Sequence, residues 1–250
     1  MIGIIIQART GSTRLPNKML LPFYDNKGLL EILVTNLINS DLNIPIVLAT
    51  TNLSTDDKLA DIAKRNKTLV YRGSENDVLD RFLQASIKYD INKIVRICAD
   101  NPFLDMFFLK NLIEKFSEND CDYWCYALSD YTPSIMTHYG FWAEGVTRES
   151  LIKINKYTKE KFYKEHVTNY IYNNKNLFNI YYELIDSFIE KQKDIRLTID
   201  TIQDFNIAKI IFNKLYDNKN TIKLFDVVNY IMKTGIYQQL MIQEILQNKK

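Results

Sequence analysis

Residues 2–18, IGIIIQARTGSTRLPNK, join a short apolar run to a polar loop and give the strongest indication of the fold. Residues 2–7 are rich in isoleucine, which is typical of a strand buried on both faces of a parallel sheet. The loop behind this run places small residues beside cations, namely Gly11, Ser12 and Thr13 with Arg9, Arg14 and Lys18. The stretch therefore predicts a buried strand that delivers a polar loop to the edge of a sheet.

Short apolar runs then alternate with amphipathic segments up to about residue 120. Further strands are predicted at 45–50, 68–71 and 93–98, and helices at 29–39, 55–66, 76–89 and 106–116. Such alternation predicts an α/β fold of three layers, α/β/α, around a mostly parallel sheet with right-handed crossovers.

The second half has a different rhythm. It predicts strands at 122–127, 180–184 and 195–199, a loop-like aromatic segment at 128–147, and helices at 160–173, 203–215 and 222–232. Tyr237, Met241 and Ile245 recur at helical spacing in the tail, and we expect this stripe to pack on the chain or on a partner subunit. We expect one domain over residues 1–216 and a C-terminal helical extension over 217–250.

Composition narrows the class of protein. The 250 residues contain 32 Lys and Arg against 30 Asp and Glu, so the near balance argues against a protein that coats nucleic acid or an anionic membrane. No window approaches the roughly 20 apolar residues that span a bilayer. Three cysteines form no complete disulfide or metal-ligand pattern, which favours reduced thiols and a cytoplasmic location.

Ligands of open parallel sheets bind beyond the carboxyl ends of the strands. The loop at 8–18 comes first in this position, and its small residues and cations are compatible with a polyphosphate cradle, although a surface loop with scattered charges has the same composition. The glycine spacing matches neither a Walker A loop nor a dinucleotide fingerprint.

Two aspartates follow β-rich runs directly. Asp100 follows residues 93–98, and Asp200 follows residues 195–199. They could share a Mg²⁺ ion, which prefers oxygen ligands, or each could cap the next element, as Asp204 could do for its own helix. Arg96, inside the preceding strand, is expected to point to the same edge or to pair with a carboxylate.

Six segments now support a family resemblance. QARTGSTRLPNKML at 7–20 resembles the motif of the cytidylyltransferases that include 3-deoxy-manno-octulosonate cytidylyltransferase, and it is more similar to SpsF-type proteins of spore-coat polysaccharide biosynthesis. The other matching segments are VLATTN at 47–52, YRGSENDVLDRF at 71–82, VRICADNPFLD at 95–105, RLTIDTIQDF at 196–205 and, for the SpsF type, EHVTNYIY at 165–172.

The resemblance implies a nucleotide-diphospho-sugar transferase (Rossmann-like) fold and transfer of a nucleotidyl group, usually CMP from CTP, with release of pyrophosphate. It implies that Arg9 and Lys18 are catalytic, and that Asp100 and Asp200 bind Mg²⁺. The implied nucleotide-binding residues are Gln7, Ala8, Arg9, Thr10, Gly11, Ser12, Arg14, Lys18, Thr50, Arg72, Ser74, Asp77 and Arg81.

The chain departs from the family pattern at two positions and in one segment. Asn17 replaces a frequent glycine, and asparagine tolerates left-handed backbone geometry. Asn101 stands where SpsF relatives often have cysteine, and residues 140–151 match only loosely, which leaves the acceptor open. Candidate acceptor residues are Asn101, Tyr139, Trp142, Glu144, Glu165 and His166, although the aromatic residues could equally pack a dimer and His166 could be structural.

The expected function is a Mg²⁺-dependent cytidylyltransferase that activates a sugar acid, sugar phosphate or phosphonate for surface-glycan biosynthesis. Its partners would be CTP and an anionic small-molecule acceptor, with residues 122–185 forming the acceptor and dimerisation part of a homodimer. The alternatives are a transferase of the same fold that uses another NTP, and a non-catalytic nucleotide-binding subunit.

Overall fold

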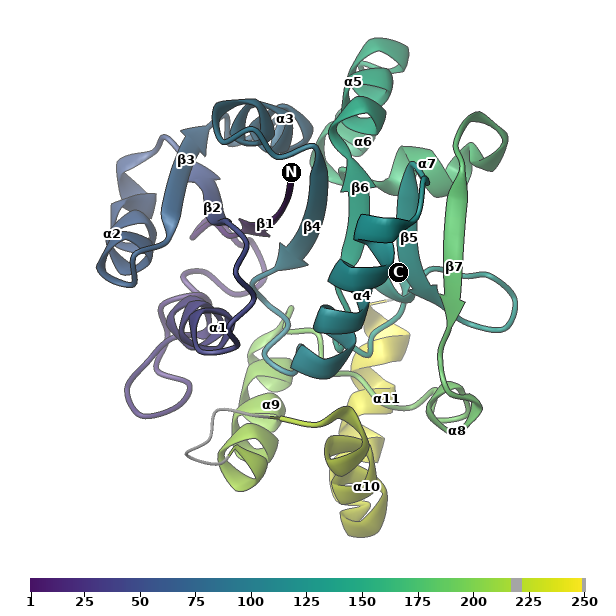
Figure 1. The fold of residues 1–250 in the computed structure, drawn as a ribbon. Coiled ribbons are helices and arrows are strands. Elements are labelled where there is room, and N and C mark those ends of the chain that lie inside the picture. The colour runs from purple at the N-terminus through teal and green to yellow at the C-terminus, as the bar shows by residue number, and fades with distance from the viewer. Residues whose placement is uncertain (217–221, 249–250) are drawn as a thin grey trace.

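The computed structural model describes residues 1–216 and 222–248, and one sheet of seven strands organises them (Figure 1). The strand order is β3-β2-β1-β4-β6-β5-β7. The strands are β1 (Ile2–Gln7), β2 (Ile46–Thr51), β3 (Leu69–Gly73), β4 (Lys93–Cys98), β5 (Tyr123–Ala127), β6 (Glu144–Thr147) and β7 (Ile180–Leu184). The predicted α/β class and mostly parallel sheet are confirmed.

Strand β6 is the exception to the parallel arrangement. It pairs antiparallel with both β4 and β5, whereas the other strand pairs are parallel. The prediction that residues 128–147 form only a loop is therefore wrong at its end. The strand is hard to recognise from the sequence because it begins with Glu144, and a carboxylate is unusual in a buried strand. In the structure, the register places Glu144 directly opposite Arg96 of β4.

The first strand shows how the isoleucine run organises two cores. Ile4 and Ile6 belong to the hydrophobic cluster on one face of the sheet, and Ile5 belongs to the cluster on the other face, as the two-residue period of a strand requires. Helices α1 (Leu29–Ile38), α2 (Asp57–Arg65), α4 (Met106–Glu118), α9 (Ile202–Leu215) and α10 (Leu224–Thr234) contribute to the first cluster, and α3 (Val78–Lys88), α5 (Arg148–Tyr157) and α7 (Asn169–Asn173) to the second. Three layers result.

Shorter elements complete the chain. They are the 3₁₀ turns η1 (Ser54–Asp56), η2 (Ser134–Met136) and η3 (Lys175–Leu177) and the helices α6 (Lys161–Glu165), α8 (Ser187–Glu190) and α11 (Gln238–Gln247). The single helix predicted at 160–173 is wrong, because the chain leaves helical geometry after α6 and buries Val167 and Thr168 before α7 begins.

The strand predicted at 195–199 is also wrong. The segment runs beside loops instead of another strand: the backbone N–H groups of Leu197 and Thr198 donate to the carbonyl of His138, and that of Ile199 donates to the carbonyl of Asp100. The hydrogen bond between Ile199 and Asp100 still brings Asp200 close to Asp100. Asp200 therefore lies at the expected edge, although the segment before it is not a strand.

The C-terminal helices pack on the chain itself. Met241 of α11 is buried in the same cluster as Val227 and Val228 of α10, and Tyr237 is partly buried against that cluster, so these two residues of the predicted stripe pack on the chain. Residues 217–221, where the predicted extension begins, lie outside the described residues. None of the described helices combines the length and apolar character needed to cross a lipid bilayer.

Candidate active site

The loop after β1 is fixed in place by a buried carboxylate. Asp56 accepts hydrogen bonds from the backbone N–H of Thr10 (2.8 Å) and from its hydroxyl (2.5 Å), and also from the hydroxyls of Thr50 (3.0 Å) and Thr51 (2.6 Å). Burial raises the pKa of Asp56, but these hydrogen bonds outweigh it and hold the pKa below its usual value. Asp56 therefore links the loop after β1 to the end of β2.

A left-handed turn then directs Lys18 inward. Asn17 has φ +59°, the geometry for which asparagine is suited, and its N–H donates to the carbonyl of Thr10 (3.1 Å). The Lys18 side chain is only 8% exposed, and its ammonium donates to Asp100 Oδ2 (2.8 Å) and to the Ile199 carbonyl (2.6 Å). One cation of the first loop thus connects the segments that carry the two candidate metal ligands.

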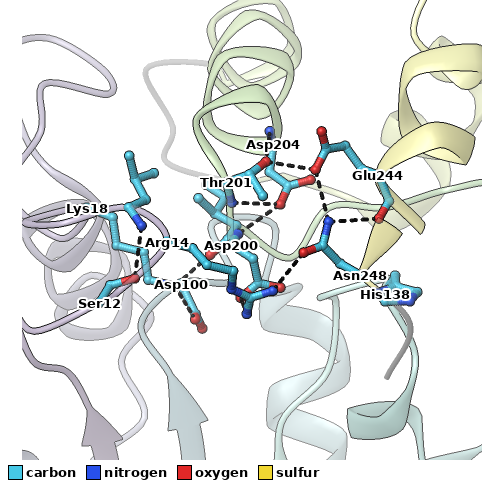
Figure 2. Close-up of polar contacts among 12 residues, drawn as sticks. Ser12, Arg14, Lys18, Asp100, His138, Asp200, Thr201, Asp204, Glu244 and Asn248 are labelled. Atoms are coloured by element: carbon cyan, nitrogen blue, oxygen red, sulfur yellow. Dashed lines mark hydrogen bonds and ion pairs between the residues drawn. The ribbon is translucent and has the colours of Figure 1, made fainter. Parts of the chain in front are cut away.

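Arg14 forms an ion pair with the other aspartate, Asp200. Its guanidinium donates to Asp200 Oδ1 at 2.8 Å, while Arg196 donates to Asp200 Oδ2 at 3.0 Å (Figure 2). Arg196 is itself fixed by two hydrogen bonds to Asp204, at 2.7 and 2.9 Å. Asp204 also forms a capping box with Thr201 at the start of α9, as its position in the first turn of the predicted helix had suggested.

The chemistry of this edge fits Mg²⁺ that arrives with a triphosphate. Magnesium in such sites is held by one or two carboxylates, substrate phosphates and water. Asp100 and Asp200 are partly exposed, border the same cavity and are balanced by Lys18 and Arg14. Among the described residues, no group of three or more His, Cys, Asp and Glu side chains is placed to hold a metal by itself.

Arg9 lies on the other side of the loop. It donates to the Glu75 carbonyl at 3.3 Å and pairs with Glu165 of α6 at 3.0 Å. Behind it, Arg81 is fully buried and donates to the Ser74 carbonyl at 2.7 Å. Burial, and then the positive charge of Arg9, lower the pKa of Arg81 to about 10.

Other candidate nucleotide residues have contacts within the chain. Arg72 donates to Asp57 (2.6 Å) and to two backbone carbonyls, those of Thr51 and Leu53. Asp77 caps α3. The Gln7 side chain accepts from Arg96 at 3.0 Å, Ala8 is buried, Gly11 is exposed, and Ser12 accepts from the Leu15 N–H at 3.4 Å. These groups surround the loop, but Arg72 and Asp77 already serve the scaffold.

A cavity of about 520 Å³ opens beside the two aspartates. Its wall includes three residues with a buried polar atom that has no partner among the described residues: Nε of Arg96, Nε1 of Trp142 and Oγ1 of Thr198. A buried donor without a partner costs about 1–3 kcal/mol. The wall is completed by Gln7, Arg14, Cys98, Asp100, Asn101, Ser134, Ile135, Met136, Thr137, Gly140, Phe162, His166, Asn169, Tyr172, Asn173, Asp200 and Asn248.

A buried ion pair supports the back of this cavity. Arg96 donates to Glu144 Oε1 at 2.6 Å, and Thr168 donates to the same oxygen at 2.8 Å. The Tyr123 hydroxyl donates to the other carboxylate oxygen, and burial and the charge of Glu144 raise the pKa of Tyr123. Arg96 thus meets both expectations, since it points to the cavity edge and pairs with a carboxylate.

The candidate acceptor residues divide into two groups. Asn101, Trp142 and His166 line the cavity, whereas Glu144 and Glu165 do not, the former being paired with Arg96 and the latter with Arg9. Tyr139 is buried, and its hydroxyl donates to backbone carbonyls of Ile189 and Glu190 at 3.2 Å. Burial lowers the pKa of His166, so the ring is neutral at neutral pH.

Several residues of the site were not predicted as site residues from the sequence. Asn169, Asn173 and Thr198 reach the cavity from segments far apart in the chain, and asparagine and threonine are common on any surface. Arg196 lies four residues before Asp200, inside the predicted strand at 195–199, and its pairing with Asp204 depends on where α9 begins. Asn248, at the end of α11, had no pattern that placed it near the first loop.

Comparisons with known proteins agree on one family. A family model described as Cytidylyltransferase matches residues 3–242. The spore coat polysaccharide biosynthesis protein SpsF of Bacillus subtilis is 37% identical over 219 residues, which cover 85% of this chain and 87% of SpsF. A solved cytidylyltransferase from Leptospira borgpetersenii superimposes with a TM-score of 0.83 at 31% identity, covering 97% of this chain and 96% of that one.

The fold extends to more distant structures. The structure of a CMP:2-keto-3-deoxy-manno-octonic acid synthetase complexed with CTP matches with a TM-score of 0.63 at 12% identity, and the match covers 85% of this chain and 98% of that one. At this identity the likeness concerns the fold alone. It confirms the predicted Rossmann-like nucleotidyltransferase architecture.

Proposed function

Because the chain belongs to the cytidylyltransferase family and is thus a CTP-using nucleotidyltransferase, we propose that it transfers CMP from CTP to an anionic small-molecule acceptor. An acceptor oxygen attacks the α-phosphorus, the bond from that phosphorus to the bridging oxygen of the β-phosphate breaks, and pyrophosphate leaves with the electron pair. The observation that carries the proposal is the pairing of Lys18 with Asp100 and of Arg14 with Asp200 at one edge of the cavity.

Each charged group has a defined part in this reaction. Lys18, Arg14 and Arg9 are cations on one loop and stabilise the negative charge that grows on the phosphate oxygens. Asp100 and Asp200 would hold Mg²⁺ together with the triphosphate. Bound Mg²⁺ neutralises phosphate oxygens and orients the leaving group. The chain therefore contributes positioning and electrostatics, and a nucleophilic side chain is not required.

The acceptor is proposed to bind in the cavity of about 520 Å³. Arg96 offers a positive charge, and the partnerless donors of Arg96, Trp142 and Thr198 favour a ligand with carboxylate, phosphonate, phosphate or hydroxyl oxygens. A sugar acid, sugar phosphate or phosphonate fits this chemistry, and SpsF-like relatives suggest a place in surface polysaccharide synthesis.

The state of the protein in the cell is part of the proposal. Cys121 and Cys125 are buried thiols, which fits a reducing cytoplasm.

Strand β7 is a sheet edge with Tyr181 and Leu184 exposed on it, and Phe107 of α4 is 73% exposed. We propose that a second copy covers this edge in a homodimer, because an uncovered edge with apolar side chains favours association. A monomer in light scattering at all concentrations would contradict the dimer.

A pyrophosphate-release assay tests the reaction. The full chain is supplied with Mg²⁺, each of the four common NTPs in turn, and a panel of sugar acids, sugar phosphates and phosphonates. The proposal expects pyrophosphate with CTP and at least one acceptor, and none after Mg²⁺ is chelated. Release with another NTP alone would favour a different nucleotidyltransferase, and tight CTP binding without release across the panel would favour a binding subunit.

A further inference from the structure

The end of the C-terminal helix reaches the first loop. Asn248 follows α11 directly, and its side-chain oxygen accepts a hydrogen bond from Arg14 at 3.0 Å (Figure 2). The amide nitrogen of Asn248 donates to the Glu244 carbonyl at 3.0 Å and to Glu244 Oε2 at 3.2 Å. Two segments separated by 234 positions therefore meet at Arg14.

These contacts belong to a ring of linked residues that includes Asp200. Glu244 Oε2 accepts from the Thr201 hydroxyl at 2.9 Å, and Thr201 is the next residue after Asp200. Arg14 returns to Asp200 through its second terminal nitrogen. The Asp200 carboxylate is thus linked to Glu244 through Arg14 and Asn248 (Figure 2).

The helix that provides these contacts is firmly held. Met241, one turn before Glu244, is 1% exposed and lies in the main hydrophobic core. The Arg14 side chain, by contrast, is 51% exposed and would sample many rotamers if it were held at one end only. Its two acceptors, Asp200 and Asn248, restrict it to one place.

We propose that Glu244 and Asn248 are positioning residues of the nucleotide site, which hold Arg14 beside Asp200 so that its guanidinium is in place for the triphosphate. This inference rests on the proposed function of the site. The consequence is specific: Asn248 stays available to Arg14 when the oxygens of Asp200 are needed by a bound ligand. The C-terminal helix therefore belongs to the active site as well as to the scaffold.

A double-mutant cycle separates positioning from folding. Binding of CTP with Mg²⁺ to the full chain is measured by calorimetry, without an acceptor, for Asn248→Ala in the natural background and in Arg14→Ala. We expect Asn248→Ala to raise the Kd for CTP about fivefold in the natural background and less than about twofold in Arg14→Ala. The thermal midpoint should change by no more than about 2 °C, and Gln247→Ala, an exposed neighbour, should match the natural protein in both measurements.

Variants of Glu244 provide a second test by the same CTP-binding measurement. Glu244→Gln keeps an oxygen that accepts from Thr201 and Asn248, whereas Glu244→Ala removes it. The proposal expects Glu244→Ala to weaken CTP binding about threefold or more and Glu244→Gln to restore binding to within about twofold.

Two results would overturn the positioning role. One is unchanged CTP binding in Asn248→Ala; the other is the same loss of affinity with and without Arg14. Failure of the proposed function looks different, because the natural protein would then release no pyrophosphate with CTP, or Lys18→Ala and Asp100→Ala would bind CTP and turn over as the natural protein does. If those variants lose both while Asn248→Ala loses neither, only the role of the helix is wrong.

Discussion

The two halves of the cleft satisfy their charged groups differently. On the side proposed for the nucleotide, Lys18 and Arg14 are paired with Asp100 and Asp200, and the loop is fixed by Asp56. On the acceptor side, Arg96 is paired with Glu144, but Trp142 and Thr198 each have a buried polar atom without a partner in the described part of the chain. The cations of the first half are thus paired with the two aspartates, whereas the second half leaves two buried polar atoms without a partner among the described residues.

This difference has a physical consequence. A ligand on the nucleotide side must replace existing ion pairs, so removal of a charge there changes how the triphosphate is stabilised. A ligand on the acceptor side fills places where hydrogen bonds are absent, so removal of a donor there weakens acceptor binding without harm to the empty protein. Variants in the first half should therefore lower turnover, whereas variants in the second half should mainly weaken acceptor binding.

The largest effect is expected from the nucleotide side. Lys18→Met and Asp100→Ala should each lower turnover by about 10²–10³, because each removes one preorganised electrostatic contact. Lys64→Met, on an exposed lysine, is the matched control and should keep normal turnover. Folded Lys18→Met or Asp100→Ala protein with near-normal pyrophosphate release would contradict the site assignment.

Asp56 tests whether the first loop depends on its anchor. Asp56→Asn should lower the free energy of unfolding by about 2 kcal/mol in urea denaturation, because a buried charged acceptor of several hydrogen bonds is lost. Asp57→Asn, which affects an exposed ion pair with Arg72, should lower it by less than about 1 kcal/mol. Equal losses in the two variants would show that Asp56 is not a special anchor.

The buried polar atoms of Trp142 and Thr198 test the side proposed for the acceptor. Trp142→Phe and Thr198→Val should raise KM for the acceptor about fivefold, with KM for CTP within about twofold of normal and the free energy of unfolding unchanged or higher. The measurements use the acceptor identified in the pyrophosphate assay. If both variants instead lower stability and leave the acceptor KM unchanged, the cavity does not bind the acceptor through these groups.

The smallest effect concerns pH. The folded pKa of His166 lies below its ordinary value of 6.5, so the unfolded chain binds a proton more readily. Stability contributed by the neutral ring is present above pH 6.5 and decreases as the pH falls below it. Melting curves at about pH 7.5 and about pH 5.5 should therefore show a smaller acid-induced loss in His166→Asn than in the natural protein. Equal losses would place the pH dependence elsewhere.

The parallel half of the sheet was predictable because its signals are local. The isoleucines of β1 and the polar loop behind them are adjacent in sequence, and Asn17 adopts the left-handed turn that its side chain suits. Asp100 also follows its strand directly. In each case, one short segment contains both the residue and the reason for its position.

The mixed half of the sheet was hidden because its signals are distant. Glu144 is acceptable in β6 only because Arg96 lies opposite it, and the two are 48 positions apart. Residues 195–199 reach the cleft by pairing with loops, which no periodicity reveals. The contact of Asn248 with Arg14 spans almost the whole chain, so a reading of local patterns could not find it.

The most direct test of the central claim is metal binding that depends on the nucleotide and requires no acceptor. Mn²⁺, a spectroscopic substitute for Mg²⁺, is titrated into the full chain with and without CTP and followed by electron paramagnetic resonance. We expect tight binding of about one Mn²⁺ per chain only with CTP, and a loss of affinity of about tenfold or more in Asp100→Asn and in Asp200→Asn. Unchanged Mn²⁺ affinity in both variants would contradict the central claim.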